Sequence, residues 1–452
     1  MPRKAKAPLP QPMFGEPVFN EDGAPTPDPT TFRTPHDPST DNQLYKQVQN
    51  LLTKDTVSFN TARGNPGDVF TLASALGSQG PADVQAIQKA GQIVFHATGD
   101  SGASSLGKLG HELSVADHLT NDFHTSTGAD RPAFLFHLGD IVYNFGESQF
   151  YYDQFYEPFR NYAAPIFAVP GNHDSFMIPN TTAANAPLTT FSRNFCATSP
   201  VVTQEAGSLH RTAMTQPGAY FTLDAPFVRI IGLFSNALED PGLISSQKNQ
   251  KTKWPGVPDV QLAYLTAQLK NIKAQNYTGA VLIAVHHPPF SYAPPPKAGG
   301  AGGNHLGNTL MLREIDTVCQ AQGVYPHAFL SGHAHNYQRY TRKLNFGGKN
   351  YSVPFIVAGD GGFNVKSLVY SRGGAVPPPP APGAQVSYLD PNPAVKAAGL
   401  TIEQSNQTNY GYLRITVNSM QLRIEFHPVS NGGAPPSIDT VKVDLASHTV
   451  VP

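Results

Sequence analysis

Cysteine is scarce in this chain, and long apolar runs are absent from it. Two cysteines, Cys196 and Cys319, occur among 452 residues. This excludes a disulfide framework and a cysteine-based zinc site, while one bridge and two free thiols both remain open. No apolar run reaches the roughly 18 residues that a membrane span requires, so we expect no transmembrane segment.

The first residues do not resemble an export signal. MPRKAKAPLPQPMFGEP begins with basic residues, but no apolar stretch follows them. A secretory signal needs such a stretch. As given, the sequence therefore predicts a cytoplasmic protein, with export to the periplasm or the medium as the alternative.

Charge is also sparse and balanced. Charged residues make up 14% of the chain, the formal net charge is −1, and the pI is about 7.0. No broad basic surface for nucleic acid is implied, so we expect no nucleic-acid partner; the oligomeric state stays open. Proline (42) and glycine (40) are plentiful, yet together they stay below the roughly 25–30% that is typical of low-complexity chains. The composition indicates a folded, loop-rich protein.

Five short apolar runs each end in a polar cluster. They are 92–98 before GDSG, 133–138 before GDIVY, 165–170 before GNHD, 280–285 before HHPP, and 327–331 before GHAH. Helical spacing is present at 41–54, 106–121, 147–161, 259–275 and 308–321. Strands that alternate with helices predict a layered α/β fold. The run 226–236 is a candidate for a second sheet, and 439–446 alternates like an edge strand.

The chain divides into two parts by pattern. Residues 1–90 predict an extended arm that packs on the core, with one short helix at 41–54 and otherwise irregular structure. Residues 91–452 predict one catalytic domain. Within it, the stretch at about 184–220 shows little regular pattern, and we expect this insertion to cover the site as a cap or loop.

The polar clusters predict one metal site. Ligands of open α/β sheets bind beyond the carboxyl ends of the strands, so the five clusters can meet at one sheet edge. Four of the five have a glycine before the polar residue, which suits a sharp turn. The candidate ligands combine oxygen and imidazole donors without a thiolate, a mixture that suits Fe, Zn or Mn. Seven such residues exceed the needs of one ion, and two ions that share a carboxylate are the usual device for phosphoester hydrolysis. They are Asp100, Asp140, Tyr143, Asn172, His286, His333 and His335.

The five motifs, in this order, resemble those of the calcineurin-like metallophosphoesterases. Within that superfamily they are similar to the purple acid phosphatases. The first motif is Asp100-Ser101-Gly102, where most of the superfamily has Asp-x-His, and Tyr143 follows Asp140 by three residues. The resemblance spans residues 92–340. It implies two packed, mostly mixed β-sheets flanked by helices, an α/β/β/α sandwich.

The resemblance also implies a role for each residue. The first ion, Fe(III), would be held by Asp100, Tyr143 and His335. The second ion, Fe(II), Zn or Mn, would be held by Asn172, His286 and His333. Asp140 would bridge both ions, His173 would contact the phosphate, and His287 would be only a neighbour.

The implied function is a dinuclear metal-dependent hydrolase of phosphate monoesters. A metal-bound hydroxide would attack the phosphorus, and the substrate would be a small phosphate ester. The leaving alkoxide needs a proton, and His305 in the glycine-rich loop AGGAGGNHLGN is our candidate for that acid.

Two other functions compete with this one. A phosphodiester or a phospholipid headgroup could be the substrate of the same metal site, since the insertion at 184–220 could set substrate shape. A non-catalytic binding module should lack some ligands, and none is missing here.

Ordinary structural roles are expected for other polar residues near the motifs. Asp174 should orient its turn, and His96 and His137 should be core histidines within strands. His210 and Arg211 should lie on the surface, Arg339 in a salt bridge and Asp360 in a turn.

Overall fold

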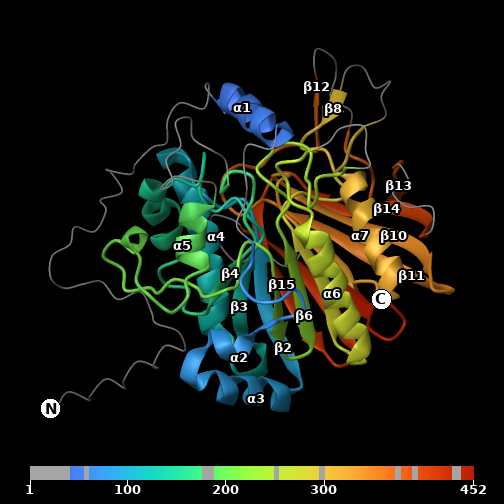
Figure 1. The fold of residues 1–452 in the computed structure, drawn as a ribbon, viewed down its shortest axis with the longest axis horizontal. Helices are drawn as coiled ribbons and strands as arrows, with labels where there is room; N and C mark the ends of the chain where they lie inside the picture. The colour runs from blue at the N-terminus through green and yellow to red at the C-terminus, as the bar shows by residue number, and fades with distance from the viewer. Residues whose placement is uncertain are drawn as a thin grey trace.

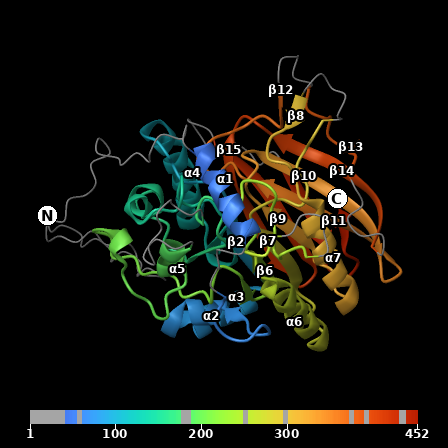
Figure 2. The same cartoon turned by 45° about the horizontal axis from the view of Figure 1, so that its top comes forward.

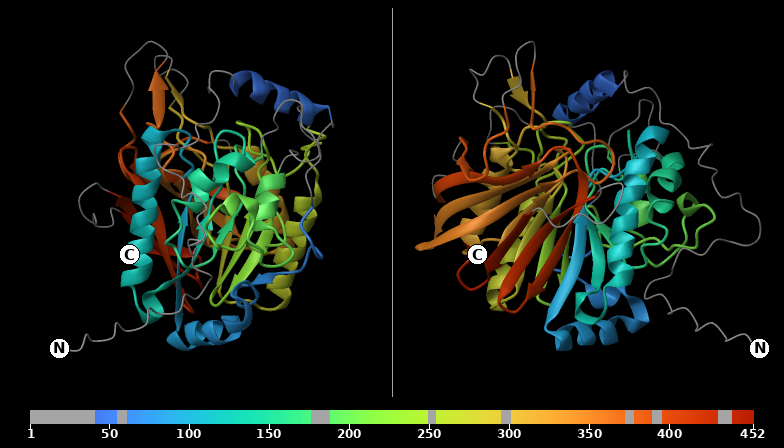
Figure 3. Two further views of the ribbon diagram at one scale, coloured as in Figure 1. Left: turned by 90° about the vertical axis from the view of Figure 1, so that its left-hand side faces the viewer. Right: turned by 180° about the vertical axis from the view of Figure 1, so that it is seen from behind.

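Two large β-sheets pack face to face and carry helices on both outer faces. The computed structural model describes residues 41–54, 61–175, 188–248, 254–294, 301–371, 378–388, 395–429 and 439–452. The layers follow one another from helix to sheet to sheet to helix, as Figure 1 and the left view of Figure 3 show. This arrangement confirms the predicted α/β/β/α sandwich.

The first sheet has seven strands in the order β18-β17-β16-β15-β2-β3-β4. Its parallel half consists of β2 (Gln92–Thr98), β3 (Pro132–His137) and β4 (Ile166–Ala168). Its antiparallel half consists of β15 (Tyr410–Asn418), β16 (Gln421–Val429), β17 (Asp439–Asp444) and β18 (Thr449–Val451). The edge-strand prediction for 439–446 is wrong, because β18 pairs with the outer side of β17.

The second sheet has nine strands in the order β1-β5-β6-β7-β9-β11-β10-β14-β13. Its strands are β1 (Phe70–Thr71), β5 (Phe221–Ala225), β6 (Val228–Leu233), β7 (Ala280–Val285), β9 (Ala328–Ser331), β10 (Tyr337–Phe346), β11 (Lys349–Ala358), β13 (Ala384–Gln385) and β14 (Lys396–Asn406). The candidate strand at 226–236 is β6, so its place in a second sheet is confirmed. A separate pair joins β8 (Ala301–Gly303) to β12 (Val369–Ser371).

Burial on both faces explains why the central strands are continuous apolar runs. Between the sheets, Phe95 and Phe136 of one sheet belong to the same buried cluster as Leu282 and Leu330 of the other. A second cluster lies between the nine-stranded sheet and the helices α6 (Val260–Ala274) and α7 (Thr309–Gln322). On the opposite face, α4 (Leu106–Thr125) covers the seven-stranded sheet.

The segment 147–161 is not the regular α-helix that its spacing predicts. It contains a 3₁₀ turn at Ser148–Phe150 and a π-helical turn at Tyr152–Tyr156. Every residue from Tyr152 to Tyr156 is buried. Aromatic side chains have weak helix propensity, and packing on all sides outweighs the 3.6-residue period here.

The N-terminal part is more regular than predicted. The expected short helix is confirmed as α1 (Asp41–Thr53), which lies at the top of the molecule in Figure 1 and crosses the middle of the view in Figure 2. The irregular structure expected up to residue 90 is wrong, because α2 (Leu72–Ala75) and α3 (Gly80–Ala90) lie there. Proline in the first turn of α3 and Gly91 with φ 79° after its last residue are ordinary helix-boundary signals.

The described part of the insertion, 188–220, lies beside the sheet edge. It contains α5 (Thr189–Phe195), and its side chains bind the segment 148–168. Cys196 and Cys319 are two buried free thiols. Within the described ranges, no helix combines the length and the apolarity needed to cross a membrane.

Candidate metal centre

The five strand-end clusters meet at one edge of the sandwich. Asp100 follows β2, Asp140 follows β3 and Asn172 follows β4 in one sheet; His286 follows β7, and His333 and His335 follow β9 in the other. All seven proposed ligands are buried. We call these seven residues the metal centre: Asp100, Asp140, Tyr143, Asn172, His286, His333 and His335.

One half of the metal centre surrounds the Tyr143 hydroxyl. This hydroxyl lies 3.2 Å from Asp100 Oδ1, 3.0 Å from Asp140 Oδ2 and 3.4 Å from His335 Nε2. His335 Nε2 lies 3.3 Å from Asp100 Oδ1. Donor atoms about 2.1 Å from a common ion lie roughly 3 Å from one another, so this spacing suits one ion.

The other half surrounds the Asn172 side-chain oxygen. Asn172 Oδ1 lies 3.0 Å from His286 Nε2 and 3.1 Å from His333 Nδ1. His286 Nε2 also lies 3.3 Å from Asp140 Oδ2. Asp140 Oδ2 is therefore close to donor atoms of both halves. Two groups of possible metal ligands share this residue: Asp140, His286 and His333, and Asp100, Asp140 and His335.

Hydrogen bonds from the main chain orient the ligands. Asp100 Oδ2 accepts a bond of 2.7 Å from the His333 amide, which ties the two sheets together. Asp140 Oδ1 accepts one of 2.9 Å from the His173 amide. His286 Nδ1 donates to the Leu138 carbonyl at 2.8 Å and so leaves Nε2 as the ring atom that faces the centre. A second ring nitrogen bound to a carbonyl is the usual support for a metal-binding histidine.

Three of the ligands themselves take the left-handed backbone conformation. Asp100 has φ 58°, Asp140 has φ 56° and His333 has φ 67°. Such conformations are rare for residues other than glycine and concentrate at functional sites. Gly171 serves a different purpose, since a Cβ there would lie 2.0 Å from Asp140 Oδ1. Of the glycines that precede the polar residues, Gly139 has a positive φ (98°), which fits the predicted sharp turn.

The buried groups of the metal centre shift one another's pKa values. Burial raises the pKa of Tyr143 well above its usual value, and Asp140 and Asp100 add to that shift. Burial disfavours the charged form of His286, but Asp140 and Asp100 outweigh it and raise the pKa of His286 to about 9. His333 Nε2 and His335 Nδ1 are buried and have no hydrogen-bond partner among the described residues. The ring atoms that face the two halves are the other ones, His333 Nδ1 and His335 Nε2. Together with the buried carboxylate, phenol and amide oxygens around them they form a donor set that fits metal ions.

Four residues surround the opening of the metal centre, and we call them the mouth: Glu239, Asp240, His305 and Lys366. Glu239 Oε2 accepts a hydrogen bond of 3.1 Å from Asn172 Nδ2. Glu239 also lies 3.8 Å from His305 Nδ1, and Asp240 lies 3.8 Å from His333 Nε2. The His305 ring packs against His333 and His335, with ring centroids 4.6 and 5.1 Å away.

His173 lies between the metal centre and the mouth. Its Nδ1 lies 2.8 Å from the Asn144 carbonyl, and its Nε2 lies 3.8 Å from Glu239 Oε2. Burial lowers the pKa of His173 to about 4, although Asp140 opposes the shift. A neutral ring whose Nδ1–H donates to a carbonyl presents Nε2 toward the opening.

The neighbouring residues take the structural roles expected of them, with two exceptions. Asp174 accepts three backbone N–H bonds and so orients its turn, and Arg339 pairs with Asp439. His96 and His137 are buried and hydrogen-bonded. His210 is exposed, as expected of a surface residue.

Arg211 and Asp360 depart from expectation. Arg211 is buried rather than solvated, because it donates to the carbonyls of Phe159, Tyr162 and Ala164. Asp360 is buried, and neither side-chain oxygen has a partner among the described residues. The mouth is formed by residues after β6, before α7 and after β11. The described part of the insertion, 188–220, has side-chain hydrogen bonds to the segment 148–168, and its expected role as a cap stays a prediction.

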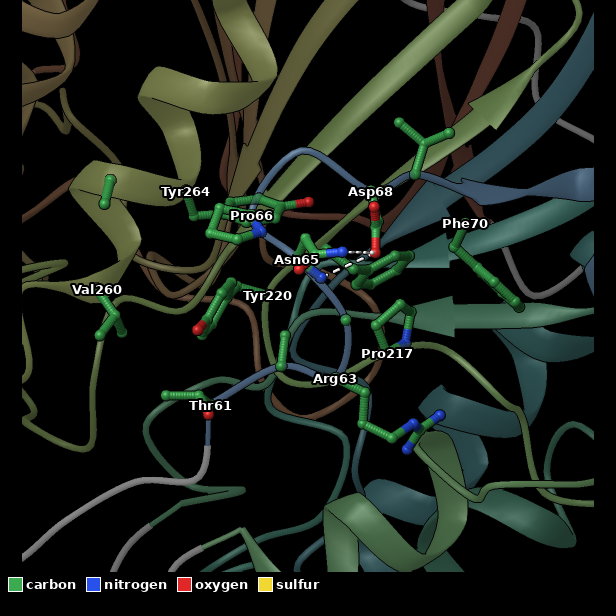
Figure 4. A pocket seen from close by; sticks show the side chains of 15 residues that line it. Thr61, Arg63, Asn65, Pro66, Asp68, Phe70, Pro217, Tyr220, Val260 and Tyr264 are labelled. Atoms are coloured by element: carbon green, nitrogen blue, oxygen red, sulfur yellow. Dashed lines mark hydrogen bonds between the residues drawn. The ribbon is translucent and has the colours of Figure 1, made fainter. Parts of the chain in front are cut away.

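A pocket of about 270 Å³ lies apart from this centre. It is lined by residues that include Arg63, Asn65, Asp68, Tyr220 and Tyr264 (Figure 4). Asp68 accepts from Asn65, and Arg63 donates to the carbonyls of 196–197 and 215–216. Its polar groups are thus already engaged, and none of the seven proposed ligands lines it.

Comparison with known proteins agrees with this geometry. Residues 95–337 match the family model for the calcineurin-like phosphoesterases, and this stretch is more than half of the 452-residue chain. The chain belongs to the calcineurin-like phosphoesterase family. It is accordingly a metal-dependent phosphoric ester hydrolase, and all seven residues of the metal centre fall within the matched stretch.

Two solved structures are similar to this phosphoesterase. One is GAP50, the anchor in the inner membrane complex of Plasmodium, with 12% identity and a TM-score of 0.46 over 78% of this chain and 89% of that chain. The other is PhoD, with 13% identity and a TM-score of 0.47 over 80% of this chain and 72% of that chain. No curated protein matches the sequence.

Proposed function

We propose that this phosphoesterase hydrolyses phosphate monoesters at a pair of metal ions. The observation that carries the proposal is the position of Asp140 Oδ2, 3.0 Å from the Tyr143 hydroxyl and 3.3 Å from His286 Nε2. One carboxylate oxygen thus lies between two sets of donors, as a bridging ligand requires.

Each set of donors has its own chemistry. Asp100, Tyr143 and His335 would hold one ion, and the phenol oxygen of Tyr143 favours Fe(III) there. Asn172, His286 and His333 would hold Fe(II), Zn or Mn, because neutral nitrogen and amide oxygen donors suit a divalent ion. When bound, the ions would lower the pKa of water and neutralise charge on the phosphate.

The protein's own groups position the phosphate and protonate the leaving group. His173 presents Nε2 toward the opening. Since its Nδ1–H is already used by the Asn144 carbonyl, it donates to a phosphate oxygen only after Nε2 takes up a second proton, which the negative charge of a bound phosphate favours. His305 is the proposed acid for the leaving alkoxide. Because His305 Nε2 lies 2.7 Å from the Lys366 ammonium, its own proton resides on Nδ1, on the side of Glu239.

Initial rates on p-nitrophenyl phosphate and bis-p-nitrophenyl phosphate, measured side by side at mildly acidic pH, test the proposal. We expect a higher kcat/KM for the monoester. A higher kcat/KM for the diester would overturn the monoesterase proposal and favour the phosphodiesterase alternative. It would not affect the assignment to the calcineurin-like phosphoesterase family. Hydrolysis of neither compound by metal-loaded protein would count against both the monoesterase and the phosphodiesterase.

A further inference from the structure

Lys366 is held in place beside the metal centre by its own main chain. It lies in the segment between β11 and β12. Its amide donates to the His335 carbonyl at 2.7 Å, and its carbonyl accepts a bond of 3.1 Å from Asn336 Nδ2. His335 and Asn336, which follow β9, therefore fix the main-chain position of Lys366.

The ammonium of Lys366 reaches the mouth. Its Nζ lies 2.7 Å from His305 Nε2, and the His305 ring packs on the rings of His333 and His335. The charge of Lys366 is therefore one imidazole ring away from two proposed ligands. Burial lowers the pKa of Lys366, and attraction to Glu239, Asp100, Asp140 and Asp240 opposes that shift.

In the part of the chain that the structure describes, one hydrogen-bond partner is found for the ammonium of Lys366. A lysine ammonium has three N–H donors. Among the described residues, its one side-chain hydrogen bond goes to the neutral His305 ring, and no carboxylate lies within ion-pair distance of it. Carboxylates attract this partly buried cation from beyond ion-pair distance, but none of those in the described ranges is bonded to it. At the opening of a phosphoesterase site, such an ammonium is suited to bind an anionic oxygen.

We propose that Lys366 binds the phosphate group of the substrate and selects monoesters over diesters. The inference rests on the proposed function and adds a specificity residue to it. A monoester has a second ionisation near neutral pH and carries up to two negative charges, whereas a diester carries one. The second charge interacts with the ammonium in a partly buried setting, where such interactions are stronger than in water.

Lys108 offers a matched control. Its Nζ lies 2.9 Å from Ser104 Oγ and 3.4 Å from the centroid of the Phe363 ring. It is near enough to Lys366 for their charges to repel, and burial together with this repulsion lowers the pKa of Lys108 to about 8. Lys108 thus shares the charge and the neighbourhood of Lys366 but does not contact His305.

The experiment compares wild type, Lys366→Met, Lys366→Arg and Lys108→Met, all loaded with metal. Two quantities are measured: the ratio of kcat/KM for p-nitrophenyl phosphate over bis-p-nitrophenyl phosphate, and the affinity for inorganic phosphate by titration calorimetry. In Lys366→Met we expect both to fall about tenfold or more, because a hydrogen bond to a charged group is lost. Lys366→Arg should restore much of both, and Lys108→Met should change each by less than about threefold.

The outcomes separate this inference from the proposed function. In the first outcome, the wild type prefers the monoester, and Lys366→Met keeps both the kcat/KM ratio and the phosphate affinity. This would overturn the role of Lys366 but would leave the monoesterase proposal intact. A wild type that prefers diesters overturns the monoesterase and the selective role of Lys366. In that case the calorimetry still decides whether Lys366 binds phosphate. Equal falls in the kcat/KM ratio and the phosphate affinity of Lys366→Met and Lys108→Met would also overturn the role of Lys366. The loss of one positive charge anywhere near the site would then explain both results.

Discussion

The metal centre and the mouth are built in different ways. In the metal centre, the side chains of Asp100 and Asp140 are 0% and 1% exposed, and main-chain bonds orient both. In the mouth, Glu239 and Asp240 are 35% and 47% exposed and come from an irregular segment. In our proposal, the buried strand ends would hold the metal ions, and the loops above them would select the substrate.

The adjacent residues His286 and His287 give the sharpest test of this division. Both are buried, but His286 faces Asp140 and Asn172, whereas His287 bonds to Ser235 Oγ and the Leu238 carbonyl. We expect His286→Ala to lower kcat/KM by more than about 100-fold, because even outer partners of metal ligands are worth about 10–100-fold. Its metal content, measured by mass spectrometry, should fall in parallel.

His287→Ala is the control for that substitution. It should keep its metal and instead lose stability, by about 1–3 kcal/mol, because two buried hydrogen bonds are removed. Unfolding by denaturant and metal analysis separate the two effects. Equal metal loss in both variants would mean that the boundary of the metal centre has been drawn in the wrong place.

Substitution of Tyr143 tests whether the two halves of the metal centre bind different ions. Its ring stacks on Phe363 at 3.6 Å, so Tyr143→Phe should keep the packing and remove only the hydroxyl. If Fe(III) is bound there, the wild type should absorb visible light and the variant should not. We expect kcat/KM to fall by about tenfold, less than in His286→Ala, because the other ligands remain. Visible absorption that is unchanged in the variant would remove Tyr143 from the ligand set.

The free energy of unfolding of the metal-free protein should depend on pH through the protonation of His286. The pKa of His286 is raised to about 9, above its unfolded value of about 6.5. The stabilisation from its protonation is therefore present below about pH 6.5 and is lost as the pH rises through about 9. The loss should be on the order of 3 kcal/mol.

Denaturant unfolding of metal-free protein across this pH range measures the effect. In His286→Ala, the free energy of unfolding should fall less between pH 6.5 and 9. Saturating metal should remove this fall in the wild type and stabilise the protein further. A metal-free wild type whose stability does not change from pH 6.5 to 9 would contradict the pKa assigned to His286.

The metal centre was predictable from sequence because each residue follows its strand closely. The apolar runs 92–98 and 280–285 coincide with β2 and β7, so Asp100 and His286 had only one edge at which to meet. The positive φ of Asp100, Asp140 and His333 was not predictable, because no local pattern marks this rare conformation for residues other than glycine. The predicted role of glycine was right for Gly139, whereas Gly171 is needed for close approach to Asp140.

The mouth was largely missed because no local pattern marks it. Glu239 and Lys366 lie in irregular segments 127 residues apart, and only the fold brings both beside His305. Lysine and glutamate are common on surfaces, so neither stands out in a sequence. His305 was found because it interrupts a glycine-rich loop. The boundary at residue 90, and the division into an arm and a catalytic domain, stay predictions.

The number of metal ions per chain tests the account most directly. Purified protein, saturated with iron and zinc and then freed of excess metal, should retain two ions per chain by mass spectrometry, whereas Asp140→Asn should retain at most one. Two ions in the wild type and fewer in Asp140→Asn would agree with a shared carboxylate. One ion per chain in the wild type, or two in both proteins, would contradict the dinuclear centre.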